Sequence, residues 1–150
     1  MKVDIKDLKR LREETSASIA DCRMALEQSN GDFQESLKWI KARGLEKAEK
    51  KSDRKTSQGL IDCYIHQDGR VAAMVSVLCE TDFVARTEEF KNLVHEICMQ
   101  VVAMNPKDVD ILLKQEYIRD PSKTIGSLIK EAIAKLGENI VVKEFKRFEI

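Results

Sequence analysis

Apolar residues in the first 44 positions recur at helical spacing, in three successive stretches. They occupy residues 5–11, 19–26 and 33–40, and in each stretch they fall on one face of a helix. Each stretch begins after a residue suited to cap a helix, and these residues are Asp4, Ser18 and Asp32. Gly44 is predicted to end the third helix. The pattern predicts a compact three-helix module at residues 1–44.

Residues 45–57 are polar and highly charged, and two interpretations of them stay open. They form either a frayed extension of the third helix or a solvated linker, and we favour the linker. The basic run at residues 47–55 also suggests RNA binding, but it contains no aromatic residue on which a base would stack. We therefore expect no direct contact with nucleic acid.

The remaining residues, 58–150, alternate between strand and helix patterns. Ile61, Cys63 and Ile65 alternate with polar positions, which predicts a half-buried strand. Asp68-Gly69 predicts a two-residue hairpin turn with positive φ at both positions. The return strand is expected at residues 71–79, with every second residue on the buried face.

Two amphipathic helices and a last strand complete this part. The helices are predicted at residues 90–101, before Asn105-Pro106, and at residues 128–136, before Gly137. Residues 140–150 are predicted to form the strand. The order of elements predicts an α+β core domain at 58–150, an antiparallel β-sheet with helices on one face.

Composition excludes several classes of protein. The 150 residues carry 26 basic and 26 acidic side chains, so no overall field favours nucleic acid or an anionic membrane. The longest apolar runs are far too short to span a bilayer. The first residues show no apolar signal region, and the four cysteines occur singly within apolar patterns. We expect a cytoplasmic protein with reduced thiols and no membrane contact.

Motifs for catalysis are missing from the sequence. The glycines form no phosphate-binding loop, and His66 and His95 have no metal-ligand spacing to each other or to the cysteines. We therefore predict no metal, no cofactor and no enzymatic activity.

Phe83 stands where an apolar strand runs into an acidic turn, directly after Asp82. Two interpretations differ in where its ring goes. In one, Phe83 packs beneath the following helix while Asp82 caps that helix. In the other, the ring points outward and enters a pocket of a partner, since aromatic side chains bury much area at low entropic cost.

Motifs along almost the whole chain, in order, resemble those of bacterial translation elongation factor Ts. The motifs are Leu11-Arg12-Glu13-Glu14-Thr15, Asp21-Cys22-Arg23-Met24-Ala25-Leu26, Asn30-Gly31-Asp32, Tyr64-Ile65-His66, Gly69-Arg70-Val71, the segment 79–86, Ala103-Met104-Asn105-Pro106 and the segment 134–140. Any one of them is weak, but the ordered set is highly specific.

The resemblance implies a guanine-nucleotide exchange factor for the GTPase elongation factor Tu. In that family the N-terminal module resembles a ubiquitin-associated domain and docks on the GTPase. A Thr-Asp-Phe-Val turn then disturbs the bound magnesium and loosens GDP. Carried over to this chain, the turn is formed by Thr81, Asp82, Phe83 and Val84. The implied docking face consists of Arg12, Ile19 and Ala20.

Two departures from the family pattern qualify this expectation. The family usually has Thr-Gly-Ala-Gly-Met-Met where this chain has residues 15–20, Thr-Ser-Ala-Ser-Ile-Ala, so an adaptable apolar contact is smaller. Longer members also repeat the core or insert a helical hairpin, whereas only residues 107–123 separate the two core helices here. The short chain implies either a weaker factor or a homodimer that pairs through residues 60–66.

His66 has two interpretations that follow from the dimer question. In a homodimer it contacts the GTPase from the second protomer; otherwise it is a hydrogen-bonded histidine at a strand end.

A rival function from another class is a protein-interaction adaptor, which would bind partners without discriminating between GDP-bound and nucleotide-free GTPase.

Overall fold

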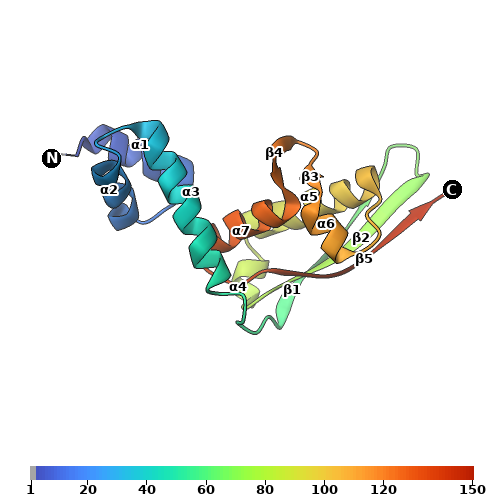
Figure 1. Cartoon of the computed structure of the whole chain (residues 1–150). Coiled ribbons are helices and arrows are strands. Elements are labelled where there is room, and N and C mark those ends of the chain that lie inside the picture. The colour runs from blue at the N-terminus through green and yellow to red at the C-terminus, as the bar shows by residue number, and fades with distance from the viewer. Residues whose placement is uncertain (1–2) are drawn as a thin grey trace.

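A computed structural model describes residues 3–150, and Figure 1 shows a helical module joined to an α+β domain. The module contains helices α1 (Ile5–Thr15), α2 (Ile19–Gln28) and α3 (Phe33–Glu49). The three predicted caps are confirmed, because each side chain accepts a hydrogen bond from a backbone N–H of the first turn. The buried apolar cluster of the module consists of Leu11, Cys22, Ala25, Leu26 and Ile40.

Helix α3 does not end at Gly44, so that prediction was wrong. The helix continues to Glu49 and lies beside α7 (Ile125–Leu136). A Cβ added to Gly44 would lie 3.2 Å from Cβ of Ala134, so this glycine permits close packing of two helices. Ala48, inside the predicted linker, belongs to the core of the α+β domain. The division at residue 44 falls within a helix, and the division into folding units stays a prediction.

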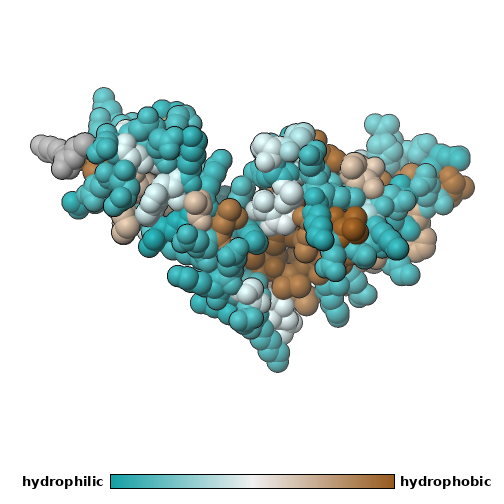
Figure 2. Space-filling model, in the orientation of Figure 1, coloured by the Kyte–Doolittle hydropathy of each residue, from teal (hydrophilic) through white to brown (hydrophobic). Residues whose placement is uncertain are grey.

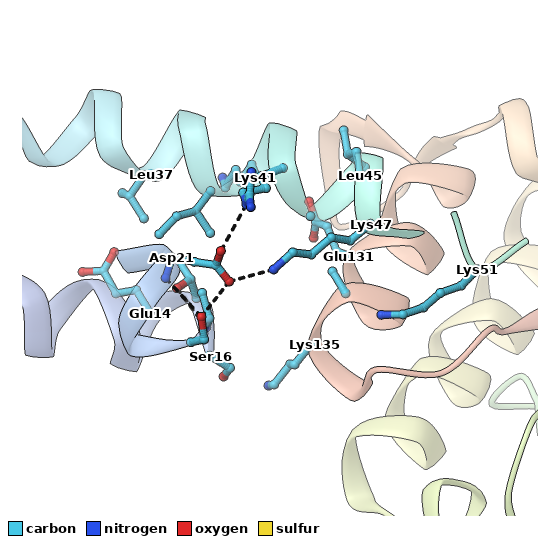
Figure 3. A pocket seen from close by; sticks show the side chains of 17 residues that line it. Glu14, Ser16, Asp21, Leu37, Lys41, Leu45, Lys47, Lys51, Glu131 and Lys135 are labelled. Carbon is cyan, nitrogen blue, oxygen red and sulfur yellow. Dashed lines mark hydrogen bonds and ion pairs between the residues drawn. The ribbon is translucent and has the colours of Figure 1, made fainter. Parts of the chain in front are cut away.

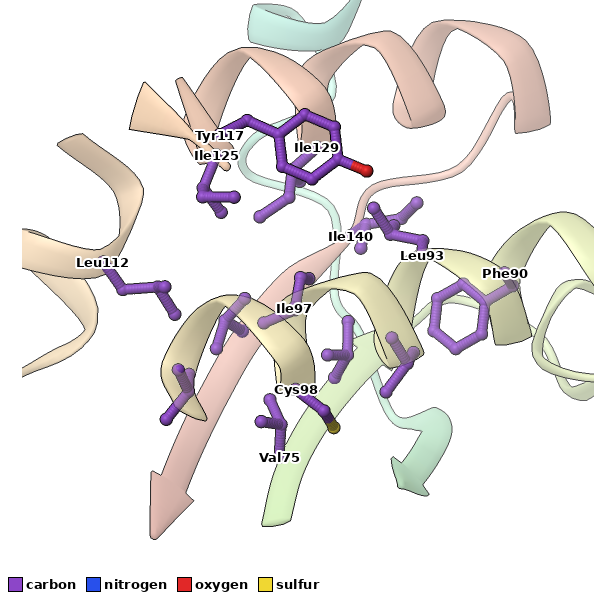
Figure 4. Packing of buried hydrophobic residues seen from close by; sticks show 14 of the residues in the cluster. Val75, Phe90, Leu93, Ile97, Cys98, Leu112, Tyr117, Ile125, Ile129 and Ile140 are labelled. Carbon is purple, nitrogen blue, oxygen red and sulfur yellow. The ribbon is translucent and has the colours of Figure 1, made fainter. Parts of the chain in front are cut away.

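The α+β domain has an antiparallel sheet, as the sequence predicted, and its strand order is β1-β2-β5. Its further elements are β1 (Gln58–Ile65), β2 (Val71–Cys79), α4 (Asp82–Ala85), α5 (Glu88–Met104), α6 (Val109–Lys114), β3 (Glu116–Tyr117), β4 (Asp120–Thr124) and β5 (Val141–Glu149). Helix α5 packs on β1 and β2, and α7 packs on α5. Figure 4 shows Ile97 of α5 between Ile129 of α7 and Val75 of β2, all of them buried.

Strand β1 presents the opposite face from the one expected. Ile61 and Ile65 are 64% and 63% exposed, whereas Leu60 and Tyr64 pack against the core. The alternation predicted a strand but not its orientation, because pairing with β2 decides which face is buried. Tyr64 lies opposite the buried Ala73 of β2, and it therefore shares the core face.

The connection between β1 and β2 is longer than the two residues predicted. The N–H of His66 donates to the carbonyl of Val71, so residues 67–70 make the turn. Gly69 has φ of +74°, but Asp68 is not among the described residues with positive φ.

The small hairpin of β3 and β4 was not expected, and it is held by the buried amide of Gln100, which bonds to the backbone of residues 116 and 118.

Polar residues cover the helical module, while apolar residues gather where α6, α7 and β5 meet in the α+β domain (Figure 2). Within residues 3–150, no helix combines the length and the apolar character needed to cross a bilayer.

Candidate partner-binding site

The turn between β2 and α4 presents Phe83 to solvent. β2 ends at Cys79, and Thr81 adopts an extended backbone and caps α4, accepting a hydrogen bond from the N–H of Val84. Phe83 is the second residue of α4, and its side chain is 78% exposed. The ring therefore does not pack beneath its own helix, and the cap is Thr81, not Asp82.

A carboxylate from the far end of the chain holds this turn. Oε1 of Glu138 accepts hydrogen bonds from the N–H groups of Glu80 at 3.1 Å and Thr81 at 2.9 Å. Oε2 of Glu138 accepts from the hydroxyl of Thr81 at 2.6 Å. Hydrogen bonds to an ionised acceptor are shorter and stronger than neutral ones. Both oxygen atoms of the Glu138 carboxylate therefore restrain the turn.

Asn139 adds a second set of restraints beside Glu138. Its N–H donates to Oε1 of Glu80 at 2.8 Å, and its Nδ2 donates to the carbonyls of Ser52 and Arg54 at 3.2 and 2.9 Å. Asn139 is buried, so these contacts are shielded from water. The turn is thereby tied to the segment that follows α3.

Of the four predicted residues of the turn, two fix its backbone and two lie at the surface. Val84 packs against the core and Thr81 holds the cap, so both fix the backbone. Asp82 forms an ion pair with Arg86 at 2.9 Å on the surface. Such exposed pairs contribute at most about 1 kcal/mol, so Asp82 is free to exchange Arg86 for another donor at little cost.

The thiol below the turn is chemically inert. Cys79 is fully buried, and its Sγ lies 3.2 Å from the carbonyl oxygen of Thr81. Burial raises the pKa of the Cys79 thiol, and the neighbouring Glu138 carboxylate raises it further. A thiol that stays protonated is a poor nucleophile, so its contribution here is packing.

The predicted docking residues lie on the helical module. Arg12 is exposed on the last turn of α1, and Ile19 and Ala20 are exposed at the start of α2. Within the described residues, no side-chain hydrogen bond or ion pair joins them to the Phe83 turn. They therefore form a second, separate surface.

Asp21 fixes the start of α2 to α3. Its carboxylate contacts Lys47 at 2.7 Å and Arg43 at 3.1 Å, and it accepts a hydrogen bond from the hydroxyl of Ser18 (Figure 3). The hydrogen bond from Lys47, with those from Ser18 and Arg43, lowers the pKa of Asp21. These contacts border a cleft of about 510 Å³ between the module and α7, which Lys135 also lines.

His66 follows the end of β1, and its Nδ1 lies 3.1 Å from the hydroxyl of Tyr64. The second histidine, His95, bonds to Asp62 at 3.0 Å. Over residues 3–150, no three His, Cys, Asp or Glu side chains are grouped so that they could hold a metal ion. The hydrogen bond agrees with a strand-end role for His66, and its contact with a GTPase stays a prediction.

Sequence reasoning missed the residues that hold the turn, namely Glu80, Glu138 and Asn139. Glu138 and Thr81 are 57 positions apart, and no local spacing pattern connects residues at that separation. The only available signal was that the segment containing Glu138 and Asn139 matched the family motifs.

Comparisons with known proteins point to the same family as the sequence motifs do. Residues 80–150 match the family described as Elongation factor TS. The chain is 40% identical to Elongation factor Ts of Thermoanaerobacter sp. (strain X514), covering 98% of this chain and 94% of the relative. It is 40% identical to Elongation factor Ts of Coprothermobacter proteolyticus, covering 100% and 99%. The Herpetosiphon aurantiacus protein of that name is 37% identical, covering 100% and 98%.

These alignments are longer than the chain itself. The alignment with the Coprothermobacter protein has 195 positions against 150 residues, so at least 45 positions of the alignment have no residue in this chain. The relatives therefore carry internal segments that this chain lacks.

Proposed function

We propose that this chain, which belongs to the elongation factor Ts family of translation elongation factors, is a guanine-nucleotide exchange factor for elongation factor Tu. It binds the GTPase in the cytoplasm, disturbs its magnesium and phosphate site, and promotes release of GDP. The observation that carries this proposal is the exposed ring of Phe83 on a turn with a fixed backbone.

The Phe83 ring is exposed to solvent in the free protein, so its burial against a partner would favour binding. Burying an exposed phenylalanine against a partner contributes about 2 kcal/mol. The hydrogen bonds to Glu138 order the backbone around Phe83 before binding, so less entropy is lost on association. We expect Asp82, the residue before Phe83, to exchange its ion pair with Arg86 for hydrogen bonds from backbone N–H groups of the partner.

Release of GDP then follows from thermodynamic linkage. An exchange protein that binds best to a GTPase with a distorted nucleotide site lowers the affinity of the GTPase for GDP. By linkage, GDP lowers the affinity of the GTPase for the exchange protein to the same extent. No covalent bond is made or broken, so no nucleophile, general base or cofactor takes part. The docking face at Arg12, Ile19 and Ala20 contributes affinity without entering the nucleotide site.

The test is release of fluorescent GDP from elongation factor Tu, measured with and without this chain. The proposal predicts a release rate that rises with the concentration of the chain and then saturates. An unchanged rate contradicts it. Binding of equal strength to the GDP-bound and nucleotide-free GTPase would support the adaptor function instead.

A homodimer is the second part of the proposal, and the outer face of the sheet supports it. Ile61, Ile65, Met74 and Phe148 are exposed on the face opposite the helices, and Ile65 and Phe148 both pair with Ala72 of β2. Contiguous exposed apolar residues on a sheet favour association. A second copy would cover this face, and His66 at the end of β1 would then lie close to the interface.

Sedimentation equilibrium tests the dimer. The wild-type chain is expected at twice the mass of one chain, and Ile65→Glu at the mass of one chain. Cys63, the exposed cysteine on this face, should react slowly with a thiol reagent in the wild type and rapidly in Ile65→Glu. A wild-type monomer with a rapidly reacting Cys63 contradicts the dimer.

A further inference from the structure

The short connection between α7 and β5 contacts two segments that are distant in sequence. Glu138 bonds to the backbone and hydroxyl of the turn that carries Phe83. The adjacent Asn139 bonds to Glu80 and to the carbonyls of Ser52 and Arg54. Three parts of the chain therefore meet here: the end of β2, the segment after α3 and the start of β5.

The contacts of Glu138 serve the turn alone. Among the described residues Glu138 has no ion-pair partner, and its three hydrogen bonds all go to Glu80 and Thr81. Within the described residues, the stabilisation that the protein gives this half-buried carboxylate comes from the three donors that it binds. Without it, the N–H groups of Glu80 and Thr81 would lose their acceptor just before α4 begins.

The contacts of Asn139 connect the turn to the segment that follows the docking module. Glu80 accepts from the N–H of Asn139 and forms an ion pair with Arg54 at 3.6 Å. Asn139 also holds the carbonyl of Arg54. The hydrogen bonds of the buried Asn139 thus join residues 52–54, which follow α3, to residue 80, and the partly exposed pair of Arg54 and Glu80 adds to them.

We propose that Glu138 and Asn139 are positioning residues for nucleotide exchange, which hold Phe83 outward and fix it relative to the docking module. This inference rests on the proposed exchange function. Neither residue needs to touch the nucleotide, because Glu138 acts through the backbone of residues 80 and 81 and Asn139 acts through the side chain of Glu80. The exposed Phe83 is then directed by these long-range contacts in addition to its own helix of four residues.

The first experiment measures GDP release from elongation factor Tu with Glu138→Ala. Loss of hydrogen bonds to a charged acceptor predicts a maximal release rate about tenfold lower. The half-saturating concentration should change little, because the docking face is intact. Glu138→Gln keeps one acceptor oxygen and should retain an intermediate rate. The matched control is Glu131→Ala, which removes a carboxylate on α7 that pairs with Lys123, and it should behave as wild type.

A double-mutant cycle separates positioning from a general loss of stability. If Glu138 acts by orienting Phe83, then Glu138→Ala has no further effect in a Phe83→Ala background. Equal losses in both backgrounds contradict the proposal, as does a wild-type rate for Glu138→Ala.

Amide hydrogen exchange of the free chain tests the same point without the GTPase. The amides of Glu80 and Thr81 should exchange about tenfold faster in Glu138→Ala than in wild type, and at the wild-type rate in Glu131→Ala. Unchanged protection in Glu138→Ala contradicts the positioning role. If the wild-type chain fails to accelerate GDP release, the proposed nucleotide-exchange function is wrong. The amide hydrogen-exchange measurement still decides in that case whether Glu138 orders the turn.

Discussion

The Phe83 turn and the start of α2 both present apolar side chains to solvent, but different contacts hold them. At α2, Ser18 and Asp21 are three residues apart and form a local cap, and Asp21 then binds α3. At the turn, the main restraint comes from Glu138, 57 residues from Thr81. The start of α2 is therefore held by a local helix cap together with ion pairs to α3, and the Phe83 turn mainly by contacts with residues far away in the sequence.

This difference predicts different sensitivity to mutation. A helix cap contributes about 1 kcal/mol and its loss affects one helix end. A buried network loses several partners at once when one member is removed, and the groups left behind lack acceptors or donors. Mutations in the network around Glu138 and Asn139 should therefore affect exchange more than mutations of surface pairs nearby.

The largest effect is expected for Phe83→Ala. The loss of one aromatic anchor at the centre of an interface costs about 2 kcal/mol or more, which corresponds to a fall of about 30-fold in stimulated GDP release. Because the ring is exposed in the free chain, the free energy of unfolding should stay as in wild type.

The control for Phe83→Ala removes an exposed apolar side chain elsewhere. Ile111→Ala, on α6, should leave the release rate unchanged. A release rate for Phe83→Ala equal to that of Ile111→Ala would remove Phe83 from the account.

Asn139→Ala is expected to have the next largest effect, and it acts on stability. It leaves the carbonyls of Ser52 and Arg54 without a buried donor, which costs about 1–2 kcal/mol in the free energy of unfolding. Urea unfolding measures this cost. Gln67→Ala removes an exposed amide in the β1–β2 turn and should cost less than about 0.5 kcal/mol. Equal stability of the two variants contradicts a structural role for the Asn139 network.

The contact between α2 and α3 is expected to weaken in acid. The folded state lowers the pKa of Asp21, so its contribution to stability is complete above the ordinary aspartate value of about 3.9. The contribution is lost as pH falls through that value toward the lowered pKa. Thermal unfolding of wild type and Asp21→Asn should therefore differ at neutral pH and converge in acid. A constant difference across this range contradicts the assigned pKa shift.

The smallest effect is expected for Arg86→Ala. The pair with Asp82 is on the surface, so its loss should change the free energy of unfolding by less than about 1 kcal/mol. Stimulated GDP release should stay within about twofold of wild type, since Asp82 remains available to the partner. A large loss of exchange would show that Arg86 itself contacts the GTPase.

Local patterns predicted the elements that depend on local chemistry. The caps at Asp4, Ser18 and Asp32 could be predicted because a capping side chain and its target N–H are two or three residues apart. The buried face of α5 followed from apolar spacing, and residues 90, 93, 94, 97, 98 and 101 are all buried. The exposed position of Phe83 was one of two interpretations, and its ring is exposed.

Features that depend on packing partners could not be predicted from local patterns. Alternation in β1 gave no orientation, and Ile61 and Ile65 face solvent because Tyr64 pairs with the buried face of β2. Gly44 resembled a helix end, but Ala134 of α7 requires a small residue there. The hydrogen bonds from Thr81 to Glu138 depend on the fold that brings the end of α7 to the end of β2.

The most direct test of the central claim observes the ring of Phe83 itself. A fluorinated phenylalanine placed at position 83 gives a ¹⁹F signal whose broadening by a soluble paramagnet reports solvent exposure. The account predicts strong broadening in the free chain and protection when nucleotide-free elongation factor Tu is added. A ring that is protected in the free chain, or that stays exposed in the complex, would contradict it.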